Sequence, residues 1–514
     1  MVDVLVLRST YVALLGFCDV ANIITIPDSL KQLDDAIACG FAHGEIPAEA
    51  YALLSDLELP LYDRVIHASH APLGCWLAAV IPCTNPSARF GGVIVDGECL
   101  YLGAASVYRV AMLQFREQNL FNLVDLIRAI AGAAPPNVPE RLYVNQSAGL
   151  RFAVPLGRAV ALNPGASEAA RCWAAENFAR LAKALSDEGF TPILVGASCD
   201  GEVCERIAAA ARVTIPNFAG RTTIPEMAAL LARCELVICA DTGAAHLAAA
   251  VGTTVLGLYG ATAWFAETAP YGDNHLILQT PLNAPMSAIS LESVVAAAMN
   301  RLGRISSSDL QNELRHVNQL AWETSIEPPC RNDAVGGIAY RPMHGEAILD
   351  RGIHDRVFGR CLREAFAGEF IRSAGTAGMS EMEGREIEGT GLENACDALA
   401  RILDSMQFAA HRCAESMRKA TASEGTREAG SALMAATDRI RALANEPAWL
   451  PLIPVIHNLD WRLRMLPRQS PASTLAGHAT AYASAARVLR HASTSWQKRT
   501  GKERTPRFRE KAEI

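Results

Sequence analysis

The sequence contains no CxxC pair and no cluster of cysteine and histidine residues at the spacing of a zinc site, although it has 14 cysteines. This lack argues against a zinc-dependent or dithiol redox protein. Two pairs of cysteines lie beside apolar segments instead: Cys199 with Cys204, and Cys234 with Cys239. We predict that these four are buried thiols in a reducing cytosol, with a disulfide or metal-binding role as the alternative.

Long apolar runs are also missing. The apolar stretches, such as 73-LGCWLAAVIPC-83, are well short of the roughly 20 residues that a membrane-spanning helix needs. Asp3 and Arg8 interrupt the short apolar start of the chain, so the sequence predicts no signal peptide. We therefore expect a soluble, cytoplasmic protein with no membrane span.

An excess of positive charge is absent as well. The formal net charge is −7 and the isoelectric point is about 6.0, which argues against nucleic acid as the main partner. Half of the 514 residues are hydrophobic and 20% are charged, so large cores can be buried. The length suits two or three domains of ordinary size, and no repeat of solenoid period is present.

Strand-like and helix-like segments alternate over the first 300 residues. The clearest alternation lies between 157 and 303, where strands are predicted at 159–165, 191–197, 235–240 and 254–260, and helices at 173–189, 201–212 and 225–234. Weaker strand patterns occur at 3–7, 22–26, 63–68 and 92–97. Such alternation is typical of doubly wound parallel α/β units. We therefore predict an α/β fold with two Rossmann-like domains facing a cleft, over 1–152 and 153–305.

The strand pattern disappears beyond about 305. Amphipathic helices are predicted at 357–374, 391–421 and 427–445, separated by Gly- and Ser-rich joints. The sequence thus predicts a mostly helical extension over 306–514. Its basic end, 498-KRTGKERTPRFREK-511, is expected to be a solvated tail, with contact to an anionic surface as the alternative.

The segment 241-DTGAAH-246 follows directly after the predicted strand 235–240 and precedes a small-residue helix. Ligands of parallel α/β sheets bind beyond the carboxyl ends of the strands, where helix N-termini offer unpaired N–H groups to phosphates. Asp241, Thr242 and Gly243 would line that point, and His246 could donate to a phosphate oxygen or a sugar hydroxyl. The simpler interpretation is helix capping by Asp241 and Thr242 and a structural role for His246.

Two further strand ends carry polar residues. Ser167 and Arg171 follow the strand at 159–165, where a hydroxyl and a guanidinium could bind a phosphate. Glu202 follows the strand at 191–197 and could accept hydrogen bonds from ribose hydroxyls, or could simply complement a helix dipole.

These motifs resemble the nucleotide-sugar domain of glycosyltransferase family 9, the heptosyltransferases of lipopolysaccharide core assembly. The family's D-T-G-x-x-H-L-A-A-A-x-G-x-P-x-x-x-L-[FY]-G-x-T run is similar to 241-DTGAAHLAAAVGTTVLGLYGAT-262, which departs mainly at Thr254. The family's P-G-[AS]-x-x-x-x-[KR]-x-W-P stretch is similar to 163-NPGASEAARCWA-174, where Ala174 replaces the usual Pro. The preceding 219-AGRTTIPEMAALLARCELVICA-240 resembles the family's helix and strand before the D-T-G run.

The resemblance implies a GT-B fold and an inverting, metal-independent transfer from a nucleotide-activated sugar, often ADP-heptose, to a glycan, lipid or protein acceptor. It places Arg171 at the family's basic phosphate-binding position and Glu202 near its nucleoside-binding acid. It implies no cofactor and no metal ion beyond the donor substrate. Peripheral contact with a membrane stays open.

The family's general base is an aspartate in a loop after the first strand, within an I-R-x-[SG]-x-x-G-D pattern. Val6-Leu7-Arg8-Ser9 fits its start, but no Gly-Asp pair follows, and Asp19 is displaced by several residues. In a second register, 18-CDVANIITI-26 matches the tail of the family's second unit, which implies that the first strand and the catalytic loop are missing from this chain.

His67 and His70 are weaker candidates for the missing base, because they lie at a predicted strand end in the acceptor-side domain. The simpler interpretation is two polar residues at a strand exit. Without an assigned base, a non-catalytic nucleotide-sugar-binding protein is the alternative to a transferase. A GT-B sugar epimerase is a third hypothesis, which the D-T-G-x-x-H pattern favours less.

Overall fold

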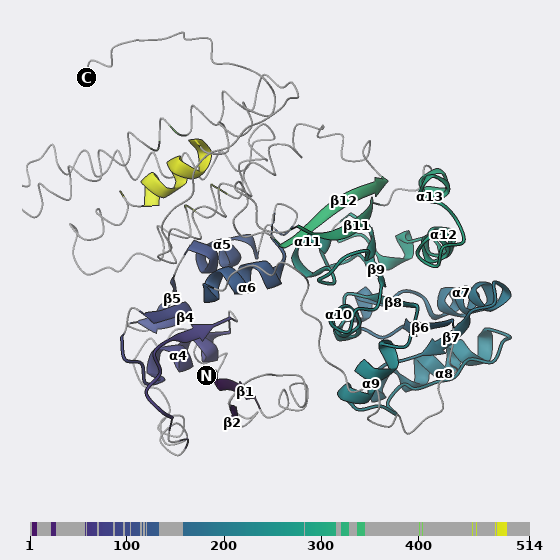
Figure 1. Ribbon diagram of the computed structural model, residues 1–514, viewed down its shortest axis with the longest axis horizontal. Helices are drawn as coiled ribbons and strands as arrows, with labels where there is room; N and C mark the ends of the chain where they lie inside the picture. Colours follow the sequence, from purple (N-terminus) through teal and green to yellow (C-terminus); the bar gives the residue numbers. More distant parts are fainter. Residues whose placement is uncertain are drawn as a thin grey trace, which may run out of the picture.

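The computed structural model describes two groups of elements and a short C-terminal helical stretch (Figure 1). The described residues are 3–7, 22–26, 59–68, 71–85, 88–95, 98–102, 104–113, 121–132, 158–281, 283–314, 320–327, 337–344 and 481–490, with single residues at 57, 116, 119, 400, 403, 455, 459 and 479. Within these residues, no helix combines the length and the apolar character needed to cross a membrane.

A seven-stranded sheet forms the centre of the second half, in the order β12-β11-β10-β9-β8-β6-β7. Five of its strands are parallel: β6 (Ala159–Asn163), β7 (Thr191–Leu194), β8 (Leu236–Ala240), β9 (Val255–Tyr259) and β10 (Leu276–Gln279). Nearly every residue of these strands is buried, as expected where helices cover both faces of a parallel sheet. The α/β class and the strands predicted in this region are confirmed.

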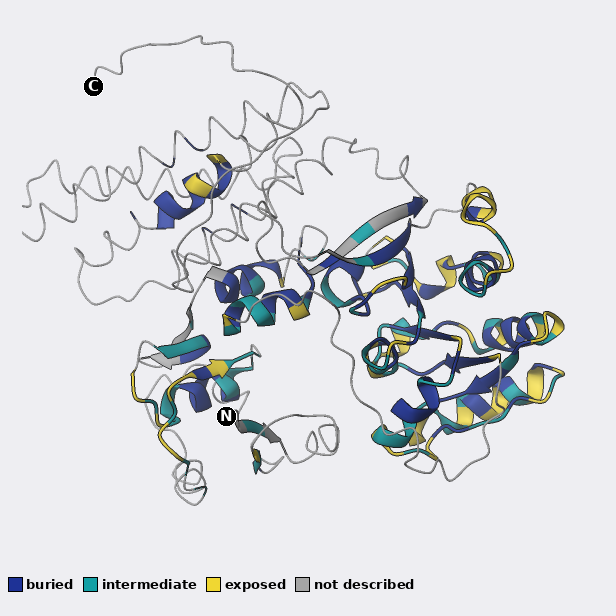
Figure 2. Cartoon of the chain, in the orientation of Figure 1, coloured by how far each residue is buried: buried dark blue, intermediate teal, exposed yellow. Residues whose placement is uncertain are grey.

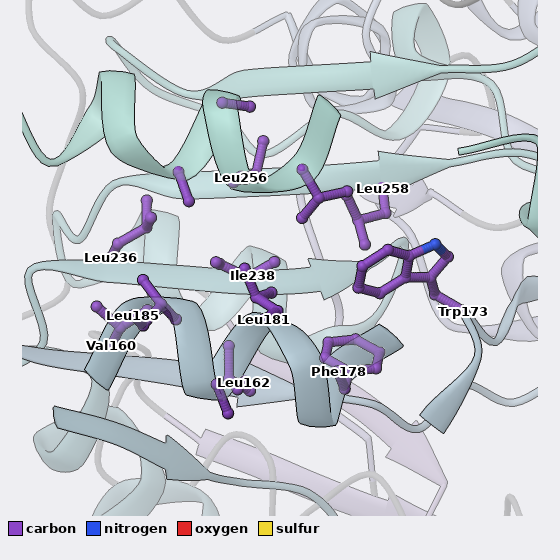
Figure 3. Close-up of a cluster of buried hydrophobic side chains, with 14 of the residues drawn as sticks. Val160, Leu162, Trp173, Phe178, Leu181, Leu185, Leu236, Ile238, Leu256 and Leu258 are labelled. Atoms are coloured by element: carbon purple, nitrogen blue, oxygen red, sulfur yellow. The ribbon is translucent and has the colours of Figure 1, made fainter. Parts of the chain in front are cut away.

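Alternate residues of each strand face opposite cores. On one face, Leu162, Ile238 and Leu256 pack with helices α7 (Ala175–Asp187), α8 (Gly201–Ala210), α12 (Leu291–Arg301) and α13 (Ser307–Leu314), as Figure 3 shows in part. On the other face, Ala161 and Val237 pack with α9 (Ile224–Leu231) and α10 (Gly243–Ala250). The period-two alternation of side chains across a strand thus divides the apolar residues between two layers.

Two further strands extend this sheet beyond residue 305, where the sequence pattern predicted none. β11 (Leu320–Glu327) pairs antiparallel with β10, and β12 (Gly337–His344) pairs antiparallel with β11. The expectation that strands end at 305 was wrong. The register between β11 and β12 shifts between Ala321 and Trp322, and β12 contains Pro342, which an edge strand tolerates because it needs fewer N–H donors.

The described strands of the first half form two small sheets. β1 (Asp3–Leu7) and β2 (Asn22–Ile26) pair in parallel. β3 (Val65–His67) pairs in parallel with β4 (Arg89–Val95), which pairs antiparallel with β5 (Glu98–Leu102). The β4–β5 pair departs from the purely parallel arrangement predicted for this half. Helices α4 (Pro72–Val80), α5 (Ala104–Met112) and α6 (Leu123–Ala131) accompany these strands.

Helix α6 contacts the second half of the chain. The Nδ2 of Asn122, its N-cap, donates to the carbonyl oxygen of Ala269 at 3.1 Å, beside the short helix α11 (Phe265–Thr268). Arg116 reaches the same region, where its guanidinium binds the Glu267 carboxylate and the carbonyl oxygen of Thr262. Figure 2 shows that α5 is largely buried, whereas α6 combines buried residues with intermediate and exposed ones.

The cysteine prediction is confirmed at three of its four positions. Cys204, Cys234 and Cys239 are buried free thiols, and burial raises the pKa of each to about 12. Cys199 was predicted to be buried but is exposed, because it lies in the short 3-10 turn Ser198–Asp200 that leads from β7 into α8.

Residues 481–490 are helical and mostly buried, with Tyr482, Val488 and Leu489 inside and Arg487 and Arg490 exposed. The three helices predicted between 357 and 445 lie outside the described residues, apart from Ala400 and Leu403, which are helical and buried. The basic tail at 498–511 also lies outside them.

Candidate functional site

A cluster of polar side chains lies at the carboxyl ends of β6, β8 and β9. It combines Arg171 from the loop after β6, Asp241 and Thr242 from the turn after β8, His246 from α10 and Thr262 from the loop after β9. The strand ends meet here because these strands are parallel neighbours in the sheet. The structure therefore brings together Arg171, Asp241, Thr242 and His246, which the sequence proposed from separate motifs.

Arg171 is the central cation of this cluster. Its Nε donates to the Thr262 hydroxyl at 2.9 Å, and its Nη2 lies 3.1 Å from Oε1 of Glu168. Its Nη1 is 3.5 Å from Oδ2 of Asp241. The Arg171 side chain is 18% exposed, so these partners enclose most of it.

Trp173 fixes the loop that carries Arg171. Its indole is buried, donates from Nε1 to the carbonyl oxygen of Ile289 at 2.9 Å and meets the Phe178 ring edge to face. Figure 3 shows the indole at the end of the apolar layer formed by Ile238 and Leu258. Because Trp173 is anchored in the core, Arg171 two residues earlier is held close to the sheet.

Asp241 is the most enclosed acid of the cluster, with 8% of its side chain exposed. Its Oδ1 lies 3.8 Å from Nε2 of His246, whose side chain is 49% exposed and therefore open to a ligand. Partial burial lowers the pKa of His246, and the Asp241 carboxylate partly offsets that lowering. The imidazole is therefore mainly neutral at pH 7, and one of its ring nitrogens can donate a hydrogen bond.

Thr242 precedes α10, yet its side chain makes no capping hydrogen bond to that helix. Its hydroxyl donates to Oδ1 of Asn163 at 3.2 Å, and Nδ2 of Asn163 donates to the carbonyl oxygen of Val195 at 3.0 Å. The helix-capping interpretation of Thr242 is therefore wrong. A Cβ added at Gly243, the first residue of α10, would meet no atom within 4 Å, and this residue is exposed at the start of the helix.

The structure does not bring Ser167 and Glu202 into the cluster. Ser167 is exposed in the loop ahead of Arg171, and Glu202 is exposed in the first turn of α8. A different acid, Asp200, lies between the loop after β6 and the loop after β7. Its Oδ2 accepts from the Ala197 amide at 2.8 Å, and its carboxylate lies beside Gly165. A Cβ added at Gly165 would lie 1.9 Å from the Asp200 carboxylate, so glycine is needed there for the close approach.

Sequence analysis missed three residues that complete the cluster: Asn163, Glu168 and Thr262. Asn163 and Thr262 could have been proposed, because the first lies at a strand end and the second is the last residue of the D-T-G motif run. Nothing in the local sequence distinguishes Glu168 from other acids near a helix start.

His67, one candidate for a general base, packs away from this cluster. The Nδ1 of His67 is 3.1 Å from the Gly92 carbonyl oxygen, and a Cβ added at Gly74 would lie 2.1 Å from its Nε2. This packing between β4 and α4 favours a structural role for His67. His70 and Asp19 lie outside the described residues.

Within the part of the chain that is described, no three His, Cys, Asp or Glu side chains gather as metal ligands would.

The structure is that of an α/β protein with polar side chains gathered at its strand ends, and comparison with known proteins identifies the family that it resembles. Residues 122–291 match the model of "Glycosyltransferase family 9 (heptosyltransferase)". The predicted resemblance to this family is thereby confirmed.

Individual relatives match over the same region. The lipopolysaccharide core heptosyltransferase OpsX of Haemophilus influenzae is 33% identical over 114 residues, which are 22% of this chain and 33% of that protein. Lipopolysaccharide heptosyltransferase 3 of Escherichia coli K12 is 36% identical over 106 residues, 20% of this chain and 31% of that protein. The matches thus span about a third of the length of these relatives.

Solved structures of the same family are also similar. The glycosyltransferase family 9 structure from Veillonella parvula DSM 2008 has a TM-score of 0.42 and 15% identity, covering 59% of this chain and 88% of that chain. Escherichia coli heptosyltransferase WaaC with ADP has a TM-score of 0.41 and 16% identity, covering 58% of this chain and all of the other.

Proposed function

We propose that this chain is a GT-B glycosyltransferase that moves a heptose-like sugar from a nucleoside diphosphate to a glycan or lipopolysaccharide-type acceptor. The observation that carries this proposal is the cluster of Arg171, Asp241, Thr242 and His246 at the strand ends, inside the segment that matches the family. The first 152 residues would form the acceptor side, and residues 153–305 would bind the donor. The proposed sugar and the proposed class of acceptor are inferred from the resemblance to the family.

The cluster suits a leaving nucleoside diphosphate. Negative charge grows on the diphosphate as the glycosidic bond breaks, and fixed donors aimed at that charge lower the barrier. The Arg171 guanidinium can bind a phosphate through two parallel N–H bonds, and the first-turn N–H groups of α10, which begins at the exposed Gly243, can serve an anion as other helix N-termini do. These groups stabilise the leaving group without requiring a cation, which supports the metal-independent mechanism that the family implies.

The remaining donor contacts are assigned by position. His246 is exposed and neutral, so we propose that it donates to a phosphate oxygen or a sugar hydroxyl. Ser167 is exposed ahead of Arg171 and would reach the diphosphate, and Glu202 would accept from the ribose. Inversion requires the acceptor hydroxyl to attack the anomeric carbon from the face opposite the diphosphate, so the acceptor enters from the side facing the first half.

The direct test is nucleotide binding to two arginine variants. We expect Arg171→Ala to weaken ADP binding about tenfold or more at low salt, because it removes a charge-assisted contact, and the loss should shrink at high salt. Arg180→Ala is the matched control, since Arg180 is 65% exposed on α7 and forms an ion pair with Glu292 at 3.9 Å, away from the cluster. Calorimetry with ADP, GDP and UDP on both variants measures the difference, and equal affinities would refute this donor site.

Binding alone does not separate a transferase from a non-catalytic nucleotide-sugar-binding protein. Release of the nucleoside diphosphate from a bound nucleotide sugar, measured with and without a lipopolysaccharide-type acceptor, does so. Acceptor-dependent release supports transfer. Tight donor binding with no release under any acceptor would favour the binding protein instead.

A further inference from the structure

Arg171 is engaged by three protein side chains. A guanidinium has five N–H donors arranged in a planar fork. In Arg171, Nε donates to Thr262, Nη2 faces Glu168 and Nη1 faces Asp241. A phosphate that takes the Nε–Nη2 edge or the Nη1–Nη2 edge with two parallel hydrogen bonds therefore competes with one of these two carboxylates.

Glu168 is the carboxylate that can leave. Asp241 has a short side chain that is 8% exposed and is also held beside His246. Glu168 has a longer side chain that is 49% exposed, and it lies in the loop just before the 3-10 turn Ala169–Arg171. Because half of the Glu168 side chain already faces solvent, its carboxylate can turn outward more easily than the enclosed carboxylate of Asp241.

Thr262 holds Glu168 in its present position. The Thr262 hydroxyl donates to Oε2 of Glu168 at 3.0 Å, while Oε1 faces Arg171 at 3.1 Å. The same hydroxyl accepts from Nε of Arg171, so the three side chains form a closed ring of polar contacts. Glu168 thus occupies the Arg171 fork in the manner of a bound anion.

The local charge balance makes this arrangement unfavourable for an anionic ligand. Glu168 and Asp241 contribute two negative charges around the single positive charge of Arg171, and His246 is neutral. The Glu168 carboxylate would repel an approaching diphosphate, and it would also compete with the diphosphate for the N–H groups of Arg171. Without the charge of Glu168, the positive charge of Arg171 would be balanced by the negative charge of Asp241 alone.

We propose that Glu168 is an anionic gate of the donor site, which occupies Arg171 in the empty protein and must swing out before a diphosphate binds. This inference rests on the proposed donor site and adds to it a residue that sets the strength and selectivity of binding. Weak anions such as carboxylates cannot displace Glu168 from its two partners. A diphosphate can, because it offers several charged oxygens to the same fork.

The test measures the affinity of the full chain for inorganic pyrophosphate and ADP in Glu168→Gln, Arg171→Ala and the double variant. Pyrophosphate serves as a probe that does not depend on the nucleobase. We expect Glu168→Gln to raise both affinities about fivefold, the size of one unit-charge repulsion across about 4 Å in water. The gain should vanish in the Arg171→Ala background and diminish at high salt.

Glu188→Gln is the matched control, because Glu188 is 53% exposed and pairs with Arg304 at the opposite end of α7. Its affinities should equal those of the unmodified chain. Glu168→Ala provides a second variant with the same expected direction, and thermal unfolding confirms that each variant is folded.

The outcomes separate the gate from the donor site itself. If the unmodified chain binds ADP and Arg171→Ala weakens it, but Glu168→Gln binds no more tightly, the gate is wrong and the donor site stands. In that case Glu168 only stabilises its own loop. If neither the unmodified chain nor any variant binds pyrophosphate or a nucleoside diphosphate, the proposed donor site is refuted, and so is the proposed role of Glu168.

Discussion

The phenol of Tyr271 donates a 2.6 Å hydrogen bond to Oδ1 of Asp125, across the contact between the two halves of the chain. Asp125 lies on α6 and is fully buried, and its Oδ2 accepts from the Ile338 amide of β12 at 3.2 Å. Arg128 donates to the same phenol at 3.3 Å. Burial raises the pKa of Tyr271, and Asp125 raises it further, so the phenol stays protonated and remains a donor.

Replacing Tyr271 with Phe should destabilise the protein by about 1–3 kcal/mol, because it takes a hydrogen bond from a buried carboxylate. Tyr259→Phe is the comparison, since the Tyr259 hydroxyl donates to a neutral carbonyl, that of Thr268, at 2.9 Å. That change should cost about 1 kcal/mol. Urea unfolding of both variants measures the difference, and a Tyr271→Phe cost no larger than that of Tyr259→Phe would contradict the role assigned to Asp125.

Replacing Gly243 with Ala should change binding and stability in opposite directions. The added methyl group meets no protein atom within 4 Å, and alanine favours a helix more than glycine does, so the melting temperature should stay the same or rise. If a diphosphate binds at the first turn of α10, as proposed, the methyl group would crowd it, so ADP affinity should fall several-fold. Calorimetry and thermal unfolding on the same preparation test both effects. Unchanged ADP affinity would place the diphosphate elsewhere.

His275 predicts a pH dependence of stability that has nothing to do with the site. Burial, followed by the nearby Arg301, lowers its pKa from 6.5 to about 4, and its Nδ1 accepts from the Val255 amide at 3.1 Å. The unfolded chain therefore binds a proton more readily than the folded one. His275 stabilises the fold fully above pH 6.5, and this contribution is lost as the pH falls toward 4.

The loss amounts to about 3 kcal/mol for a shift of this size. His275→Asn keeps an acceptor for Val255 and cannot titrate, so its unfolding free energy should fall less than that of the unmodified chain between pH 7 and pH 4. Urea unfolding across this range gives the two slopes. Parallel slopes would show that His275 does not titrate differently in the two states.

The core of the second half could be predicted from the sequence because buried parallel strands are nearly continuous apolar runs. β11 and β12 could not, because they mix polar and apolar residues and owe their conformation to pairing with β10. In the first half, Asp96-Gly97 separates β4 from β5 in the sequence. This dipeptide is typical of β-hairpins and could have indicated the antiparallel pair.

The site was partly predictable for a topological reason. Parallel neighbouring strands bring their carboxyl ends together, so Arg171 and Asp241 could be expected to meet before their distance was known. Their partners could not be expected. The pairing of Glu168 with Arg171 and of Asn163 with Thr242 depends on side-chain rotamers and loop paths that no periodicity records.

The burial of Trp173 limits how this site can change over evolutionary time. Arg171 lies two residues before Trp173, whose buried indole is hydrogen-bonded to Ile289. The number of residues between Arg171 and Trp173 therefore fixes how far the guanidinium lies from the core. An insertion there would move the guanidinium off Asp241 or pull the indole from the core. New ligand preferences must therefore arise by exchanging side chains such as Glu168, while the length of this loop stays constant.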